Sequence, residues 1–550
     1  MTEEPKPRLI RERLDVCELD RARMSLLNPT LIAHKKNDRT IDENAKPVLD
    51  LMLREGIETV WDRYEMQQPP CKYCESGSSC SRCAMGPCRI IPPHRIRGVC
   101  GADADLIVSR NLLDMIATGA AAHSDHGRDI AETLCLVGAG KTQDYAISDT
   151  VKLKRVSEEF GIKTEGKNPV QLAAELGDAM LEEYGMRKNI LHFLNRAPKA
   201  TREIWENLGI TPRGIDHEVV DSMHRIQMGV GADYVNILLQ GLRTSLSDGW
   251  GGSMIGTEVS DILFGTPTIK SSTMNLAVLK ADHVNISVHG HNPMLSEVIV
   301  KAAADPELTA LAQKYGAKGI NLVGMCCTGS ELLMRKGVPM TGNHLNQEMI
   351  IATGALEAMV VDYQCIFPSL PRTASCFHTL IISTSSKATI PGSFFFDFHA
   401  EDAYLTAKAI VRMAVENYKN RNPQRVLIPG EPMPVMSGFS NEAIKNALGG
   451  SFKPLIDLIA AGKIRGAVGI IGCNNPHIKH DFGHVLLTKE LIRKNILCVE
   501  TGCAAIASGK AGLLRPEAAA LAGDDLRAVC ESLKIPPVLH MGSCVDNSRI

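Results

Sequence analysis

Six segments of this chain end in a residue that can bind a metal. A short apolar run covers residues 284–288, 320–323, 359–361, 467–471, 496–499 and 538–539. The side chains that follow these runs are His291, the pair Cys326 and Cys327, Cys365, Cys473, Cys503 and Cys544. Thiolates select soft metals and iron–sulfur clusters, and imidazole suits nickel and iron. One imidazole with five thiols exceeds the four ligands of a zinc site. The pattern therefore predicts a cage for an iron–sulfur cluster with at least one extra metal.

The elements that would position these side chains are parallel strands. Short β-branched runs separated by helical stretches are typical of a parallel sheet with crossover helices, and ligands bind beyond the carboxyl ends of such strands. Taken singly, each cysteine is more typical of a core, but the repeated placement argues against that reading. Consecutive extended residues point to opposite faces, so we expect only one of Cys326 and Cys327 to ligate. We also expect only one of His289 and His291, which flank Gly290, to ligate, and the spacing leaves both choices open.

A cysteine cassette lies near the N-terminus. It contains Cys71, Cys74, Cys80, Cys83, Cys88 and Cys100. A cubane cluster needs four thiolates, and the last four cysteines supply one set. Cys71 and Cys74 then form half a set, which predicts a dimer with a shared cluster. Structural zinc is the alternative; the absence of nearby histidine ligands favours iron–sulfur.

A long helix predicted over residues 103–138 carries His123 and His126. Residues three apart share one helix face, and imidazoles of near-neutral pKa can pass protons along it. Two solvated surface histidines are the alternative, which the sequence by itself favours.

Composition narrows the class of protein. The net charge of −2 argues against nucleic acid or an anionic membrane as the main partner. Apolar runs are too short for a transmembrane segment, and the charged first residues do not resemble a secretion signal. We therefore expect a cytoplasmic protein, with peripheral membrane association through a partner as the alternative. The 17 cysteines then favour metal binding over disulfides, although Cys498 and Cys530 are expected to be plain core residues.

The order of elements predicts an α/β multidomain protein. A helical domain carrying the Fe–S clusters covers residues 1–264, with helices at 44–55, 169–183 and 218–240 and a Gly-rich break at 248–252. Two Rossmann-like α/β domains follow at 265–430, with a helix at 295–312, and at 431–550. The chain ends six residues after Cys544, where a covering helix is normally found, so we expect the last domain to be incomplete.

Several motifs resemble one known family, the catalytic subunits of anaerobic nickel–iron carbon monoxide dehydrogenases. The resemblance extends from about residue 59 to the end. Its motifs are Gln68-Pro-Pro-Cys71, Cys83-Ala-Met-Gly-Pro-Cys88-Arg-Ile90, Ala122-His-Ser-Asp-His-Gly127, Asp248-Gly-Trp-Gly-Gly-Ser253, Val288-His-Gly-His-Asn-Pro293, Gly324-Met-Cys-Cys-Thr-Gly329, Gly472-Cys-Asn-Asn475, Thr501-Gly-Cys503 and His540-Met-Gly-Ser-Cys-Val-Asp-Asn-Ser548.

The resemblance implies a homodimer that oxidises CO with water to CO2, two protons and two electrons. It implies a Ni–Fe–S active-site cluster with the ligands His291, Cys327, Cys365, Cys473, Cys503 and Cys544. Cys80, Cys83, Cys88 and Cys100 match an intrasubunit [4Fe–4S] cluster, and Cys71 matches a ligand of a subunit-bridging [4Fe–4S] or [2Fe–2S] cluster. His123 and His126 match the start of a proton relay. Expected partners are a ferredoxin-like electron acceptor and, as candidates, an acetyl-CoA synthase or a nickel-insertion ATPase.

Three departures from the family accompany this resemblance. Ser79 stands where the second cysteine of the shared cluster is expected, and Cys74 is the nearby substitute. Asp129 and Glu132 stand where the histidine ladder often continues. The family also extends beyond the last motif, with a lysine near the substrate. The alternatives are a hybrid-cluster protein of the hydroxylamine reductase type, and a non-catalytic subunit for electron transfer or CO sensing.

Overall fold

The structure is a computed structural model that describes residues 4–10, 39–185 and 191–550. The chain divides into two compact units. Unit 1 consists of Met1–Met66 with Thr266–Ile550, and unit 2 consists of Gln67–Gly265. Each unit is described by itself. The three domains predicted from the sequence are a different division of the chain. They stay a prediction.

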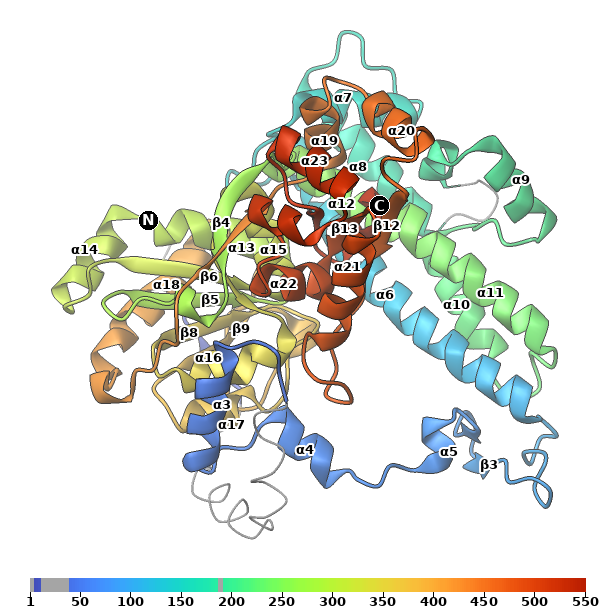
Figure 1. The fold of residues 1–550 in the computed structure, drawn as a ribbon, viewed down its shortest axis with the longest axis horizontal. Helices are drawn as coiled ribbons and strands as arrows, with labels where there is room; N and C mark the ends of the chain where they lie inside the picture. Colours follow the sequence, from blue (N-terminus) through green and yellow to red (C-terminus); the bar gives the residue numbers. More distant parts are fainter. Residues whose placement is uncertain (1–3, 11–38, 186–190) are drawn as a thin grey trace. The chain divides into compact units, whose positions relative to one another are not determined.

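Unit 2 is helical and is built around the long helix α6 (Ala104–Gly138), which contacts α8, α10, α11 and α12 (Figure 1). Asp103 caps α6 by accepting a hydrogen bond from the Leu106 amide, which satisfies one of the free N–H groups of the first turn. The other elements are α5 (Lys72–Glu75), β2 (Ser79–Cys80), β3 (Cys88–Arg89), α7 (Thr150–Glu159), α8 (Pro169–Gly185), α9 (Lys199–Asn207), α10 (Ile215–Arg225), α11 (Tyr234–Ser247), the π-helical turn η3 (Asp248–Gly252) and α12 (Ser253–Phe264).

The larger sheet of unit 1 has nine strands in the order β1-β10-β9-β8-β5-β6-β7-β4-β11. All neighbours are parallel except β1 with β10 and β11 with β4. The strands are β1 (Arg8–Leu9), β4 (Lys270–Met274), β5 (Val284–His289), β6 (Ile320–Met325), β7 (Met340–Gly342), β8 (Leu356–Val361), β9 (Leu380–Ser383), β10 (Phe394–Phe395) and β11 (Met433–Ser437).

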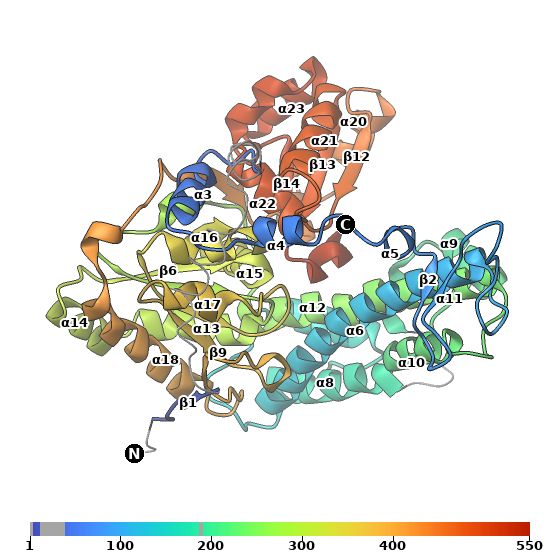
Figure 2. The ribbon, with the colours of Figure 1, turned by 90° about the horizontal axis from the view of Figure 1, so that it is seen from below.

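Helices cover this sheet and connect its strands (Figure 2). Helices α3 (Ala45–Arg54), α16 (Gln347–Ala352) and α17 (Leu370–Ser375) share one apolar core with β6 and β8. The remaining helices up to β11 are α4 (Val60–Met66), α13 (Pro293–Ala303), α14 (Pro306–Lys314), α15 (Cys326–Lys336) and α18 (Ala403–Asn417). Strand β5 is buried along its whole length, as expected for a central strand of a covered parallel sheet.

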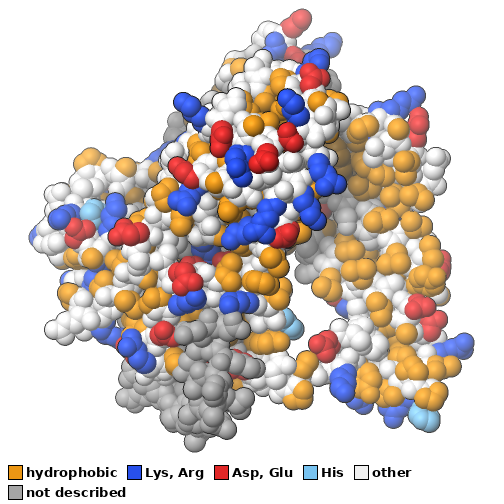
Figure 3. Space-filling model, in the orientation of Figure 1, with side chains coloured by type: hydrophobic (Ala, Val, Ile, Leu, Met, Phe, Trp, Pro, Cys, Tyr) orange, Lys and Arg blue, Asp and Glu red, His pale blue; other side chains and the backbone are white. Residues whose placement is uncertain are grey.

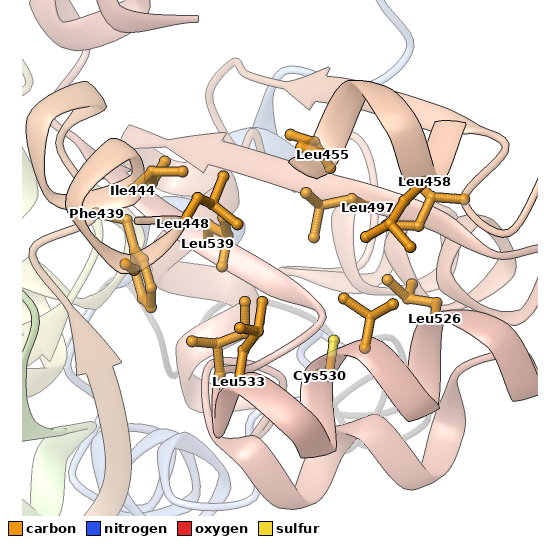
Figure 4. A pocket seen from close by; sticks show the side chains of 14 residues that line it. Phe439, Ile444, Leu448, Leu455, Leu458, Leu497, Leu526, Cys530, Leu533 and Leu539 are labelled. Atoms are coloured by element: carbon orange, nitrogen blue, oxygen red, sulfur yellow. The ribbon is translucent and has the colours of Figure 1, made fainter. Parts of the chain in front are cut away.

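A second sheet of three parallel strands lies in the same unit, in the order β12-β13-β14. Its strands are β12 (Gly466–Ile470), β13 (Ile496–Thr501) and β14 (Val538–Gly542). Its helices are α19 (Asn441–Ala447), α20 (Lys453–Ala460), α21 (Phe482–Arg493), α22 (Gly502–Lys510) and α23 (Asp524–Leu533). A small apolar cavity of about 40 Å³ lies among α19, α20, α23 and the strands, with Cys530 on its wall (Figure 4). Cys498 and Cys530 are buried, as core residues should be.

The α/β class is confirmed, and all six apolar runs that precede the metal-binding residues are strands. Two helix predictions and one predicted break are wrong. The helix expected over 218–240 is divided between α10 and α11, because Gly229 and Gly231 occupy the loop between them. The helix expected over 295–312 ends at Ala303, and Pro306 starts α14. The Gly-rich break at 248–252 is a π-helical turn that joins α11 to α12 without interruption.

Candidate metal centre

Three neighbouring strands of the larger sheet bring the first ligand candidates to one edge. His291 follows β5, Cys326 and Cys327 begin α15 directly after β6, and Cys365 follows β8. Since β5 pairs in parallel with both β6 and β8, the carboxyl ends of the three strands lie together. The second sheet repeats the arrangement, because Cys473, Cys503 and Cys544 follow β12, β13 and β14.

The two groups form one cage. The ligand atoms of His291, Cys327 and Cys544 all lie within 4.8 Å of one another. The Cys365 thiol is a hydrogen-bond partner of His291 and Cys326, and the thiols of Cys473 and Cys503 are partners of each other. The structure therefore brings together all six side chains that the resemblance names as active-site ligands.

The neighbours of the proposed ligands have different surroundings. His289 is fully buried, and its Nε2 lies 3.2 Å from Gln347 Oε1. Burial lowers the pKa of His289 to about 4, so the ring is neutral. Cys326 is close to the cage, with its thiol beside Cys365, whereas Cys327 lies beside His291 and Cys544. Cys326 thus contacts one candidate ligand and Cys327 lies beside two, and the choice of Cys327 as the ligand stays a prediction.

Backbone strain occurs at the cage, which holds three of the seven non-glycine residues with positive φ in the described part of the chain. Cys326 (φ +55°), Gln364 (φ +65°) and Cys365 (φ +61°) have left-handed backbone conformations. Such conformations are unfavourable for residues other than glycine and persist where surrounding structure imposes them, most often at functional sites.

A buried carboxylate holds the loop of His291. Asp362, directly after β8, accepts hydrogen bonds from the backbone N–H of His291 (2.7 Å), Asn292 (2.9 Å) and Tyr363. Gly290 has φ +131°, and a Cβ there would lie 1.9 Å from Asp362 Oδ1. Only glycine permits this approach. Burial raises the pKa of Asp362 to about 6, although the N–H groups of His291 and Tyr363 act in the opposite direction.

Another carboxylate holds the loop of Cys544 in the same way. Asp546 Oδ2 accepts a hydrogen bond from the Ser543 amide at 2.9 Å, and its Oδ1 pairs with Arg549. Ser543 also donates to Glu331 Oε1 at 2.5 Å, which connects this loop to α15. The Cys544 amide lies 3.3 Å from Cys327 Sγ. The sequence pattern did not single out Asp362 or Asp546, whose only signal is a carboxylate close to a strand-end ligand.

The cage is crowded with thiols. The pKa of Cys327 is raised well above its ordinary value, first by hydrogen bonding to Cys544 and then by burial. Burial lowers the pKa of His291, but the neighbouring thiolates of Cys365 and Cys544 outweigh burial and raise it. Several thiols at this spacing cannot all ionise without a compensating cation. The donor set therefore suits a metal cluster that is rich in sulfur ligands.

In unit 2, the thiols of Cys80, Cys83, Cys88 and Cys100 line one small cavity. Cys80 and Cys88 are paired directly across the hairpin of β2 and β3. The Val99 amide lies 3.4 Å from Cys88 Sγ, and a hydrogen bond from the Ala102 backbone lowers the pKa of Cys100. N–H groups aimed at cysteine sulfur are a feature of iron–sulfur sites, where they adjust the reduction potential.

Cys71 and Cys74 are exposed and lie outside that cavity. Cys71 is the N-cap of α5, and its pKa is lowered by hydrogen bonds from the backbone and the thiol of Cys74. Ser79 Oγ lies 3.5 Å from Cys74 Sγ. The structure therefore separates this pair from the four cysteines of the cavity, and Ser79 is beside the pair.

The two histidines of α6 have different environments. His126 is only 1% exposed, so the surface alternative is wrong for this residue. His123 is partly exposed, and its Nδ1 lies 3.2 Å from Asp248 Oδ2 in η3. A Cβ on Gly127 would lie 2.2 Å from the Gly252 carbonyl oxygen, so glycine allows α6 to approach η3 this closely. Ser253 donates to the other Asp248 oxygen at 2.9 Å.

Comparison with known proteins identifies the family. Residues 78–550 match the model of the Prismane/CO dehydrogenase family. The chain belongs to this family.

The relatives of this chain in the Prismane/CO dehydrogenase family include named enzymes. Carbon monoxide dehydrogenase 1 of Methanosarcina acetivorans is 56% identical over 515 residues, which are 93% of this chain and 82% of that protein. The carbon monoxide dehydrogenase/acetyl-CoA synthase subunit beta of Moorella thermoacetica is 41% identical, covering 95% of this chain and 80% of that protein. The as-isolated, Ni-free crystal structure of carbon monoxide dehydrogenase from Thermococcus sp. AM4 matches with a TM-score of 0.92 and 51% identity, covering 94% of this chain and 82% of that one.

Proposed function

We propose that this chain is a carbon monoxide dehydrogenase, which oxidises CO with water to CO2, two protons and two electrons. The observation that carries the proposal is the convergence of one imidazole and five thiols from the ends of six strands. Relatives at 41–56% identity that are named carbon monoxide dehydrogenases support the same activity. They do not favour the hybrid-cluster alternative.

The residues of the cage fit a Ni–Fe–S cluster. Its ligands would be His291, Cys327, Cys365, Cys473, Cys503 and Cys544. Thiolate sulfur suits iron and nickel in sulfur-rich sites, and six donors at two sheet edges exceed the needs of one tetrahedral ion. When bound, such a cluster would supply a soft metal for CO, Lewis-acid activation of water and storage of two electrons.

Proton removal would use His123 in unit 2. A hydrogen bond from Nδ1 to the Asp248 carboxylate selects the tautomer whose Nε2 carries the lone pair. The carboxylate also stabilises the imidazolium that forms when Nε2 takes a proton. His126 lies one turn further along α6 and continues the same face. Asp248 thus orients the base, and the two histidines provide the first steps of a relay.

Electrons would leave through two further clusters. Cys80, Cys83, Cys88 and Cys100 would hold a [4Fe–4S] cluster. Cys71 and Cys74 would share a [4Fe–4S] or [2Fe–2S] cluster with the same pair of a second subunit, because a two-fold axis duplicates whatever lies on it. The acceptor would then be a ferredoxin-like protein at this exposed site.

A homodimer is supported by the surface of unit 2. Exposed apolar side chains occur at helical spacing on α6 (Val108, Leu112 and Met115) and on α11 (Leu238 and Leu242). Hydrophobic side chains gather over these helices in Figure 3. Contiguous exposed apolar surface of this kind is typical of a protein interface.

The proposed function also includes protein partners and a location in the cell. Among the described residues, no helix combines the length and apolarity of a membrane span. An acetyl-CoA synthase partner, a nickel-insertion ATPase and a cytoplasmic location stay predictions. The existence of a relative named as an acetyl-CoA synthase complex subunit is what supports the first of them.

Metal analysis together with dye reduction tests the function. Protein purified without oxygen should contain nickel and iron and should reduce a viologen dye with CO. Full CO oxidation without nickel would refute the assignment of the cluster. Intact clusters with no CO-dependent reduction would instead favour the non-catalytic electron-transfer or sensing subunit. Iron without nickel, combined with hydroxylamine reduction, would favour a hybrid-cluster protein.

A further inference from the structure

Cys473 is the exposed thiol of the cage, and like Cys365 and Cys544 it lies outside the helices and strands. Cys327 and Cys503 lie in the first turns of helices α15 and α22. Cys473 instead lies in residues 471–479, which form neither helix nor strand, and it is exposed. The position of a ligand on such a loop depends on side-chain contacts that restrain it.

One buried aspartate restrains this loop. Asn474, next to Cys473, donates its amide to Asp481 Oδ1 at 3.0 Å, and the Asp481 backbone N–H donates to Asn474 Oδ1 at 2.8 Å. Both residues are buried. Asp481 also has a left-handed backbone (φ +67°) at the start of α21. A strained aspartate that closes a two-bond ring with the neighbour of a ligand indicates a selected geometry.

A buried lysine in turn holds that aspartate. Lys510 Nζ lies 2.7 Å from Asp481 Oδ2 and 3.2 Å from Asp42 Oδ2, with a side chain only 2% exposed. It also donates to Asn346 Oδ1 at 3.0 Å. Burial lowers the pKa of Lys510, but the two carboxylates outweigh burial and raise it, so the lysine stays charged. A charged lysine that is this deeply buried needs such partners.

Lys510 links the segments of backbone that carry or contact several cage residues. It is the last residue of α22, the helix that begins with Gly502 and Cys503. Asn346 belongs to the turn that carries His344, whose Nδ1 lies 3.7 Å from Cys503 Sγ. Asn343 of that turn also donates to Asp481 Oδ1 at 3.1 Å. The 474–481 loop, the 343–346 turn and α22 therefore meet at one ion pair.

We propose that Lys510, Asp481 and Asn474 form a positioning clamp that sets the place of Cys473 relative to Cys503 and so controls occupancy of the metal cage. None of the three is a ligand. The inference rests on the proposed function, since it assigns a role to a cage thiol. It adds residues outside the ligand set that determine whether the cage closes around its metals.

Asn474→Ala tests the clamp, because it removes both side-chain hydrogen bonds and leaves the ion pair intact. Hydrogen exchange of the as-isolated protein should become about tenfold faster in residues 471–479, as expected for the loss of one or two hydrogen bonds. Nickel per chain should fall several-fold, and the EPR signal of the cage should change, whereas the signal from the Cys80 cluster should not. Lys489→Met, in the same surface cavity as Lys510, is the matched control and should leave all three measurements unchanged.

Lys510 provides a second test. Lys510→Met should lower nickel content and Lys510→Arg should restore it, because arginine keeps the charge between the two carboxylates. Wild-type exchange in residues 471–479 of Asn474→Ala would overturn the proposal, as would faster exchange with unchanged nickel. Faster exchange across the whole unit in Asn474→Ala would also overturn the proposal, since Asn474 would then stabilise the unit in general and not this loop. If the wild-type protein holds no nickel, the proposed function fails, and the local exchange and the iron signal still decide for or against the clamp.

Discussion

Replacing Asp362 by asparagine tests whether the Asp362 carboxylate holds His291 in the cage. The carboxylate is fully buried and accepts hydrogen bonds from the amides of His291, Asn292 and Tyr363. Asparagine has nearly the same volume but presents one oxygen and one NH2 group. The oxygen can keep the bonds to His291 and Tyr363, and the NH2 group then faces the Asn292 amide, which is also a donor.

The expected cost follows from those contacts. A hydrogen bond to a charged acceptor contributes about 1.5–3 kcal/mol, and a buried N–H left without an acceptor costs about 1–3 kcal/mol. Because these two estimates partly describe the same loss, we expect about 2–4 kcal/mol against the native loop. Each 1.4 kcal/mol corresponds to a factor of ten in an equilibrium. The fraction of chains with His291 in the cage should therefore fall by about one to three orders of magnitude if the loop has a competing conformation of similar free energy.

The assay is nickel and iron content together with CO-dependent viologen reduction. Asp362→Asn should lose nickel and activity while retaining the iron of the Cys80 cluster. Asp282→Asn is a matched control, because Asp282 lies before the other end of β5 and is half exposed. Asp362→Asn protein with wild-type nickel and turnover would refute the reasoning, since the loop would then hold its geometry without the carboxylate.

Three further predictions concern the other sites. Cys327→Ala should abolish CO oxidation and Cys326→Ala should reduce it less; the reverse order in the dye assay would mean that Cys326 is the ligand. His123→Ala should slow turnover by about 10²–10⁴-fold, the usual contribution of general acid–base catalysis, with metal content unchanged, and a variant as fast as wild type would exclude a relay role. The double variant Cys71→Ser with Cys74→Ser should lose the shared cluster, seen as less iron per dimer and a missing EPR signal; an unchanged iron count would show that these cysteines do not bridge subunits.

Local features of the sequence were enough to predict the strands and the candidate ligands. An apolar β-branched run such as 284–288 has few alternatives to a buried strand, and a parallel sheet places the ends of such runs at one edge. Predicting the candidate ligands therefore required only the type of each residue and its position after an apolar run. The cysteine cassette was predictable for the same reason, because its four cavity-lining thiols lie within 21 residues (80–100) of one another along the chain.

Helix boundaries were predicted less well, because they depend on single residues and on packing. Periodicity continued across residues 226–233, but α10 ends at Arg225, and Gly229 and Gly231 lie in the loop before α11. At 248–252 the opposite occurred. A Gly-rich stretch that is typical of a break became a π-helical turn, since α6 packs against it at Gly127 and stabilises it. Tertiary contacts therefore overrode local preference at 248–252, whereas local preference prevailed at 226–233.

The sequence by itself determined which side chains could make a metal cage; only the tertiary structure decided how the cage is held. Alternation along an extended backbone left His289 and His291 equivalent, and the contact of His289 with Gln347 separates them. Asp362 and the clamp around Lys510 join segments 70 to more than 400 residues apart along the chain. No local pattern encodes such pairs, because hydrogen bonds and ion pairs act over a few ångströms in space, whatever the separation in sequence.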